Sequence, residues 1–516
     1  MSRTKNSIKN SYISLIFQGI GLFINFIVRI FFIKYLGNEY LGINGLMTNL
    51  LNVLSLAELG VGEAINFSLY EPLAKNNKEK VKSLMQLYKK IYIFIGGFIT
   101  VIGLLLIPFL NYIINDYENV NNVVLIFILF LLNTSSSYLF SYKRNLLIAD
   151  QKTYIVTIIK YVIYIIFKII QIIYLIIFSD YIGYLIIQVI ETVLEYLASS
   201  LEANKLYPYL QEKNIEKLDK ETKKDILKNT KAMMMHKVGD ILVNSTDNIL
   251  LTKIVSLTAV GLYSNYYMIT SALTMIFGQV FSSLTSSIGN LCTEKNYRKN
   301  LNIFKSLDLI TFWIYGFCSV CLFILLNPFI ELWIGKQYLF STSIIIVIVL
   351  NFYIGGMRKS VLTFREASGL FYKDRWKALV QALINLVASI ILGIKFGTIG
   401  IFLGTIISLV STCLTVEPYI LYKYCFKENV FKYYATYIGR FLILAITTVL
   451  IYSITKIINF NLIFNLIIKL IICCILCNCL FYLFFHKTKE YKYLDEKLIS
   501  KIINKIKNKV RKANAN

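Results

Sequence analysis

Residues 8–43 read IKNSYISLIFQGIGLFINFIVRIFFIKYLGNEYLGI, and their middle part, 11–33, carries a single charged side chain, that of Arg29. A helix needs about 20 mostly apolar residues to cross the hydrocarbon layer of a membrane. We therefore expect residues 11–33 to form a transmembrane helix.

The rest of the chain has the same character. Of its 516 residues, 57% are apolar and 16% are charged, and the mean hydropathy is +0.62. A soluble domain is about 45–50% apolar and about 25% charged, so this composition excludes a soluble protein. With 11–33, the sequence predicts an all-α polytopic membrane protein of about 14 transmembrane helices. The other predicted spans are 42–70, 90–113, 122–142, 153–178, 181–203, 233–255, 260–290, 306–328, 340–357, 377–396, 398–422, 435–457 and 461–485.

Basic residues alternate between the connecting segments. Of the 54 lysines and arginines, 45 fall on one set of connections, which includes both termini. Loops rich in lysine and arginine stay in the cytoplasm, so both termini are expected there. The net charge of +25 is then a signal of orientation and not of nucleic-acid binding.

An internal repeat follows from a second stretch, LKNTKAMMMHKVGDILVNSTDNILLTKIVSLTAVGL at 227–262, which aligns with 8–43 without a gap. The offset is 219, and it places Asn25 on Asn244 and Gly42 on Gly261. Six predicted spans separate the two stretches, so both have the same orientation. Such a parallel repeat is typical of transporters.

The repeat predicts two pseudo-symmetric six-helix lobes and two additional helices. The predicted parts are an N-terminal lobe at 1–203, a basic cytoplasmic loop at 204–232, a C-terminal lobe at 233–422, spans 13 and 14 at 423–485, and a basic amphipathic cytoplasmic tail at 486–516.

Polar residues recur at helical spacing along the first two spans of each lobe, which places them on one helix face. Such stripes favour a shared aqueous cavity, and packing between helices is the alternative. The residues expected to line the cavity are Gln18, Asn25, Asn49, Asn52, Asn244 and Asn248.

Charged residues within the predicted spans indicate a pathway, because a charge in hydrocarbon is costly. The candidate contacts for an anionic substrate are Arg29, Lys237, Lys160 and Lys168. The candidate carboxylates for coupling to Na⁺ or H⁺ are Asp240, Asp247, Glu58 and Glu63. By depth, Glu195 matches Lys160 and Glu191 matches Lys168. These residues either form interhelical salt bridges, or the lysines attract the substrate and the glutamates tune them.

The sequence indicates no catalytic site. It has no phosphate-binding G-x-x-x-x-G-K-[ST] loop, no loop Asp-x-Asp for a metal–nucleotide sugar, and only two histidines, which are far apart. We therefore expect a transporter without enzymatic activity, with no metal site and no cofactor other than a coupling ion.

The opening stretch together with LSLAELGVGEAI, at 54–65, resembles the polysaccharide transport proteins. The segment VGDILVNSTDNILLTKIVSLTAVGLYSNYYMI, at 238–269, resembles the start of that family's second lobe. The family includes the Wzx-type repeat-unit flippases of the multidrug/oligosaccharidyl-lipid/polysaccharide exporter superfamily.

This resemblance implies two lobes around a central cavity, and transfer of an undecaprenyl-pyrophosphate-linked oligosaccharide from the cytoplasmic to the outer leaflet by alternating access. Arg29 is the position that best fits the family's pyrophosphate-contacting cations. The implied setting is the bacterial cytoplasmic (inner) membrane, and the implied partners are membrane lipids, a polysaccharide polymerase and glycosyltransferases.

Three alternatives remain at this point. A cation-coupled multidrug antiporter of the same superfamily would depend on Asp240 and Asp247. A membrane polysaccharide polymerase or glycosyltransferase would require a sizeable outer loop, and the outer loops here are short. A scaffold for capsule assembly would leave the charges within the spans unexplained.

Overall fold

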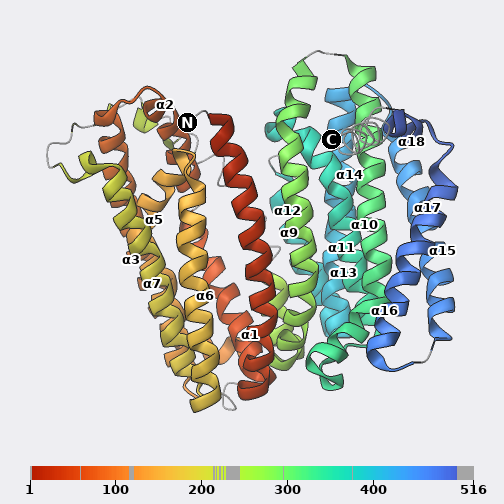
Figure 1. The fold of residues 1–516 in the computed structure, drawn as a ribbon, viewed down its shortest axis with the longest axis horizontal. Coiled ribbons are helices and arrows are strands. Elements are labelled where there is room, and N and C mark those ends of the chain that lie inside the picture. The colour runs from red at the N-terminus through yellow and green to blue at the C-terminus, as the bar shows by residue number, and fades with distance from the viewer. Residues whose placement is uncertain are drawn as a thin grey trace, which may run out of the picture. The chain divides into compact units, whose positions relative to one another are not determined.

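The computed structural model describes residues 3–58, 60–114, 121–212, 245–293, 296–374, 376–458 and 460–496 (Figure 1). It also describes single residues and short runs of the intervening loop, namely 216, 218, 219, 222–224, 226, 227 and 230. Every regular element in these residues is helical, which confirms the predicted all-α class.

Twelve helical segments in the described part of the chain are long and apolar enough to cross a membrane. They are Tyr12–Leu54, Lys78–Ile113, Val123–Ala149, Thr153–Phe178, Tyr181–Leu206, Leu257–Thr285, Tyr297–Ile334, Thr342–Ala367, Lys377–Phe396, Thr398–Phe426, Phe431–Lys456 and Leu462–Phe485.

Two of the predicted spans are not among these twelve as separate helices. Helix α1 (Arg3–Leu54) consists of two helices joined at a kink at Gly37, where φ is 85° and ψ is −177°, and residues 42–54 belong to the second of them. A 3₁₀ turn, η1 (Ser55–Glu58), and α2 (Val61–Ala74) follow, so the predicted span over 42–70 is helical but interrupted at η1. The predicted span at 233–255 falls mostly outside the described residues.

The chain folds as two compact units, Met1–Ser264 and Asn265–Asn516. The division of the lobes read from the sequence, at residues 203 and 233, stays a prediction.

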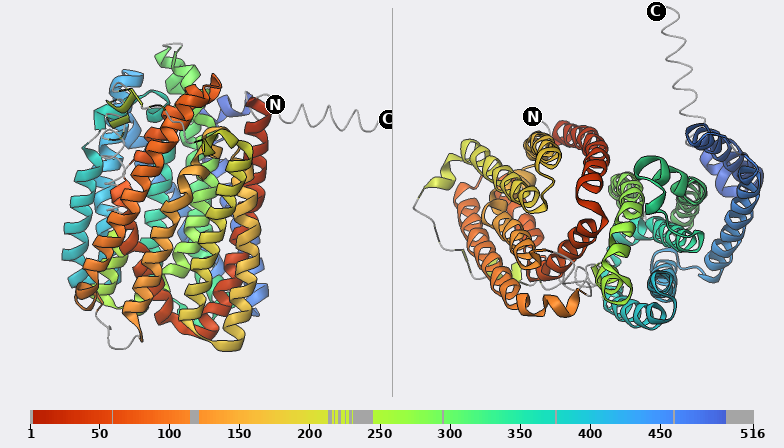
Figure 2. Two further views of the ribbon diagram at one scale, coloured as in Figure 1. Left: turned by 90° about the vertical axis from the view of Figure 1, so that its left-hand side faces the viewer. Right: turned by 90° about the horizontal axis from the view of Figure 1, so that it is seen from below.

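The first unit contains α1, α2, α3 (Lys78–Leu106), α5 (Val123–Ala149), α6 (Thr153–Phe178) and α7 (Tyr181–Leu206). Its long helices run roughly parallel or antiparallel to one another (Figure 2). Helix α5 packs against α3 and α7, and α6 packs against α1 and α7.

A tight connection fixes the register of α6 and α7. Ser179 ends α6 in the left-handed region, with φ of 49°, and the Asp180 carboxylate accepts hydrogen bonds from the backbone N–H groups of Ile182 and Gly183. An aspartate at this position satisfies N–H groups that have no partner within the helix. The short turn makes α6 and α7 antiparallel neighbours, which sets the side chains of the two helices against each other at matched depths.

The second unit contains most of α9 (Leu257–Thr293) and the helices that follow it. In it, α10 (Tyr297–Ile334) packs against α11 (Thr342–Ala367) and α16 (Leu462–Ile472). Helix α12 (Lys377–Phe396) packs against α13 (Thr398–Ser408), and α14 (Leu414–Leu421) packs on α11. The unit ends with α15 (Phe431–Lys456), α17 (Asn478–Phe485) and α18 (Lys489–Leu494).

Candidate functional site

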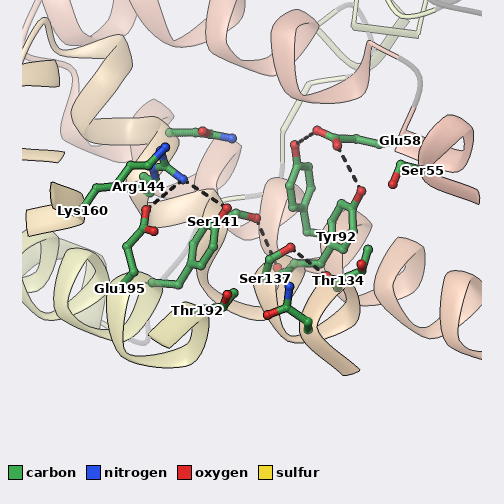
Figure 3. A pocket seen from close by; sticks show the side chains of 14 residues that line it. Ser55, Glu58, Tyr92, Thr134, Ser137, Ser141, Arg144, Lys160, Thr192 and Glu195 are labelled. Atoms are coloured by element: carbon green, nitrogen blue, oxygen red, sulfur yellow. Dashed lines mark hydrogen bonds and ion pairs between the residues drawn. The ribbon is translucent and has the colours of Figure 1, made fainter. Parts of the chain in front are cut away.

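A polar cavity of about 490 Å³ lies within the first unit (Figure 3). Its walls come from η1, α3, α5, α6 and α7. The lining residues are Ser55, Glu58, Tyr92, Asn133, Thr134, Ser137, Tyr138, Ser141, Arg144, Asn145, Lys160, Thr192, Glu195 and Tyr196. Its size is that of a small-ligand pocket, but its lining is far more polar than such pockets usually are.

One side of the cavity carries two cations. The Arg144 Nη1 atom lies 3.4 Å from the Glu195 Oε1 atom and donates a hydrogen bond of 3.1 Å to the Tyr196 hydroxyl group. The guanidinium carbon of Arg144 lies 5.2 Å from the centre of the Tyr196 ring, in the range of a cation–π contact. Arg144 is therefore held by α7 from two directions.

Lys160 contributes the second cation from α6. Its ammonium nitrogen lies 5.6 Å from the centre of the Tyr161 ring. Among the residues that the structure describes, no carboxylate lies within ion-pair distance of this ammonium group. The pairing of Lys160 with Glu195 that matched depth suggested is not what the structure shows, because Glu195 pairs with Arg144. Lys160 therefore offers its charge to the cavity.

The other side of the cavity holds one carboxylate. Glu58, in the turn η1, accepts hydrogen bonds from the hydroxyl groups of Tyr92 and Tyr138; the Tyr138 bond measures 3.3 Å. Tyr88 continues this cluster, because its hydroxyl group lies 3.4 Å from that of Tyr92 and accepts a 2.6 Å bond from the Asn145 side chain. Two tyrosine donors hold Glu58 in one place, away from the cations.

Lys168, also on α6, is absent from the cavity lining. Its ammonium group lies 3.0 Å from the Glu191 Oε2 atom and donates to the Gln171 Oε1 atom at 2.8 Å. Gln171 in turn donates to the backbone carbonyl of Tyr184 at 3.1 Å. All three polar side chains of this cluster are buried. This arrangement matches the salt-bridge alternative for Lys168 and Glu191, while a substrate contact by Lys168 stays a prediction.

Arg29 and Asn25 of α1 are also outside the cavity lining. The Arg29 Nη1 atom donates to the Ser264 hydroxyl group at 2.9 Å, and Asn25 accepts a 2.5 Å bond from the Tyr164 hydroxyl group. The predicted contact of Arg29 with a pyrophosphate therefore stays a prediction.

The remaining candidate residues from the sequence do not line the cavity or are not described by the structure. Asn49 donates to the backbone carbonyl of Gly45 at 2.7 Å, while Asn52 is exposed. Gln18, Asp247 and Asn248 are half-buried and outside the cavity lining. Four candidates are outside the described residues or have side chains that are not described: Lys237, Asp240, Asn244 and Glu63. Their predicted roles are untested.

Sequence reasoning missed Arg144 and the tyrosines of the cavity. Arg144 lies just beyond the predicted span 122–142, but α5 continues to Ala149 and places it on a helix. A signal was present, because Thr134, Ser137, Ser141 and Arg144 follow one another at spacings of three or four residues. Such a polar stripe on one helix face, ending in a cation, indicates a cavity wall.

Metal binding has no support in the described residues, where no group of three or more His, Cys, Asp or Glu side chains could hold an ion. The cavity can instead bind a polar, anionic group. It offers a guanidinium and an ammonium group from different helices, and hydroxyl and amide groups between them and Glu58.

The sequence pattern of the polysaccharide biosynthesis protein family matches residues 7–286, a segment that contains the whole cavity. No curated protein matches the chain.

Solved structures are similar in fold. The lipid II flippase MurJ, in its inward closed conformation, is 18% identical, with a TM-score of 0.66 over 93% of this chain and 99% of that one. An inward-facing multidrug resistance MATE family transporter of the MOP superfamily is 14% identical, with a TM-score of 0.60 over 80% of this chain and 98% of that one. The Vibrio cholerae MATE transporter VcmN, in its bent form, is 15% identical, with a TM-score of 0.51 over 82% and 98%.

Proposed function

The chain belongs to the polysaccharide biosynthesis protein family, and we propose that it is a flippase for a lipid-linked oligosaccharide. It is a multi-pass membrane protein with the fold of the multidrug/oligosaccharidyl-lipid/polysaccharide (MOP) exporter superfamily. The proposed substrate is an undecaprenyl-pyrophosphate-linked repeat unit, moved from the cytoplasmic to the outer leaflet by alternating access for the synthesis of a cell-surface polysaccharide.

The observation that carries this proposal is the pair of cations in the cavity. A pyrophosphate group bears at least two negative charges, and it must lose much of its hydration before it can cross the membrane. Arginine binds phosphate oxygens through two parallel hydrogen bonds, and lysine acts as a point charge. Arg144 and Lys160 supply one group of each kind, and the Lys160 ammonium group has no ion-pair partner among the described residues.

The position of these cations along their helices supports the same proposal. In the orientation predicted from the loop charges, Arg144, Lys160 and Glu195 all belong to the cytoplasmic halves of their spans. A lipid-linked repeat unit is assembled at the cytoplasmic face, so its headgroup would enter from this side. The hydroxyl and amide groups toward Glu58 then suit the first sugar, which needs several hydrogen-bond partners.

Transport of this kind breaks no covalent bond, so the proposal requires no catalytic residue. Na⁺ or H⁺ is the proposed coupling ion, and Glu58 and Asp247 are the described candidates for binding it. The proposed setting is a bacterial cytoplasmic membrane with both termini in the cytoplasm. A polymerase and glycosyltransferases would act on the same lipid and are the proposed partners.

A cation-coupled multidrug antiporter is the second candidate, and Glu58 is the observation that favours it. A carboxylate held by two tyrosines in a half-buried cavity is suited to exchange a cation for a cationic drug. The carboxylate, and not Arg144 or Lys160, would then dominate binding in the cavity.

Reconstitution in liposomes separates the two candidates. Fluorescent undecaprenyl-pyrophosphate oligosaccharide is incorporated, and its accessibility to a membrane-impermeant quencher is followed with and without the protein. The flippase proposal predicts that the protein makes the inner pool accessible. Absence of flipping, together with cation-dependent efflux of a lipophilic cationic dye that Glu58→Gln abolishes, would support the antiporter.

A further inference from the structure

The Arg144–Glu195 ion pair of the cavity has a counterpart in the second unit. Arg144 and Glu195 lie in α5 and α7, and Arg358 and Glu417 lie in α11 and α14. Arg358 follows Arg144 by 214 residues and Glu417 follows Glu195 by 222, close to the repeat offset of 219. Each unit therefore has an arginine–glutamate pair between helices that lie at similar positions in the predicted repeat.

The two ion pairs differ in the number and length of their hydrogen bonds. In the second unit, the fully buried Glu417 carboxylate accepts two hydrogen bonds from Arg358, of 3.1 Å from Nε and 2.8 Å from Nη2. Lys377 donates to the same carboxylate, and the Arg365 Nη1 atom lies 3.5 Å away. A bidentate pair with additional cations around it is among the strongest arrangements for a buried carboxylate.

The pair in the cavity is loose by comparison. A single contact of 3.4 Å joins Arg144 to Glu195, longer than a normal N–H···O hydrogen bond. Among the described residues, the Arg144 Nε atom and the Glu195 Oε1 atom have no hydrogen-bond partner. The side chains of Arg144 and Glu195 are 21% and 14% exposed, whereas that of Glu417 is 0% exposed. The cavity pair is therefore less completely hydrogen-bonded than the pair around Glu417.

We propose that Glu195 is an internal competitor for the anion-binding site, holding Arg144 in the empty cavity and yielding it to a doubly charged phosphate group. This inference rests on the proposed function and names the property by which the site selects its substrate. The four charged side chains of the cavity, Arg144, Lys160, Glu58 and Glu195, sum to zero. The charges of the cavity therefore balance one another before a substrate binds.

The site selects doubly charged anions because Glu195 is part of the protein and always lies close to Arg144. A carboxylate attached to α7 competes for Arg144 at an effective concentration in the millimolar range or above. Singly charged anions, which gain only one strong contact, are displaced by it. A pyrophosphate group reaches Arg144 and Lys160 at once, so it can outcompete Glu195. Every anion must break the contact between Glu195 and Arg144 in order to bind. Only an anion with two charges gains enough binding free energy from Arg144 and Lys160 to offset that loss.

The test measures binding of inorganic pyrophosphate to the purified full-length protein in detergent, by titration calorimetry at fixed ionic strength. Glu195→Gln is expected to bind pyrophosphate about tenfold more tightly than the wild type, and to become sensitive to competition by chloride. Glu195→Asp keeps the competing charge and is expected to resemble the wild type. Glu331→Gln, far along the chain in α10, is the matched control and is expected to change nothing.

An unchanged or weaker affinity of Glu195→Gln for pyrophosphate would overturn the inference, and so would absence of binding in both the wild type and this variant. Failure of the proposed function has a different signature. If Glu195→Gln binds pyrophosphate more tightly but the wild type flips no lipid in liposomes, the competitor role stands and the flippase proposal falls.

Discussion

Gly42 of α1 and Gly261 of α9 occupy reciprocal positions in one helix contact. A Cβ atom on Gly42 would lie 2.2 Å from the Leu257 carbonyl oxygen, and one on Gly261 would lie 2.4 Å from the Asn38 carbonyl oxygen. At the repeat offset of 219, Gly42 corresponds to Gly261 and Asn38 to Leu257. The contact therefore maps onto itself when the two repeats are exchanged, as a parallel two-fold repeat requires.

Gly42→Leu and Gly261→Leu are expected to destabilise the protein, because neither position has room for a Cβ beside the opposing backbone. Overpacking of a close contact costs about 1–3 kcal/mol. The midpoint of thermal unfolding in detergent measures the effect. Gly97→Leu in α3 is the control, since a Cβ there meets nothing within 4 Å. Equal midpoints for all three variants would show that the helices do not approach this closely.

Glu417→Gln is expected to be strongly destabilising. It removes the charge that Arg358, Arg365 and Lys377 share, and leaves buried cations without compensation. Loss of one partner from a buried ion pair costs about 3–5 kcal/mol. Thermal unfolding of Glu417→Gln is compared with that of Glu331→Gln, whose partner Lys336 is 82% exposed. A midpoint as high as that of the control would mean that the cluster contributes little to the stability of the second unit.

We expect that the protein stays stable when Lys168 and Glu191 are replaced together, but not when only one of them is replaced. Lys168→Met alone leaves the buried Glu191 without its partner and should lower the unfolding midpoint. The double variant Lys168→Met/Glu191→Met removes both charges and should recover most of the loss, because apolar replacements of a buried ion pair are often neutral. The flipping assay then tests its function. A well-folded double variant that flips no lipid would show that the pair is required for transport and not only for stability.

The sequence predicted the membrane spans well because a helix in hydrocarbon must satisfy its own backbone and present an apolar surface, and both demands are visible in composition. The kink at Gly37 falls in the connection between the predicted spans 11–33 and 42–70, so the sequence indicated it. The interruption of the second span by the 3₁₀ turn η1 was not predicted.

Charge pairing was predicted less well than the spans. Matched depth correctly placed Lys168 beside Glu191, but Glu195 pairs with Arg144 and not with Lys160. The depth of a residue in the membrane does not determine how its helix is rotated about its own axis. It also does not show which other helix lies beside the pair, which is α5 in this protein. Arg358, Arg365 and Lys377 lie between or at the ends of the predicted spans 340–357 and 377–396, yet they converge on a buried carboxylate. Sequence alone does not reveal the partner that brings such cations inside.

The most direct test of the proposed pyrophosphate site is the rate at which the lipid-linked oligosaccharide is flipped in liposomes. The liposomes contain protein variants in which a charged residue of the cavity is replaced. Lys160→Gln and Arg144→Gln are each expected to slow flipping by about tenfold or more, because each removes a charge-assisted contact to phosphate. Lys160→Arg keeps the charge and should retain most of the rate. Lys395→Gln, an exposed lysine of α12, is the control for loss of a cation elsewhere. Wild-type flipping by both Lys160→Gln and Arg144→Gln would contradict the account.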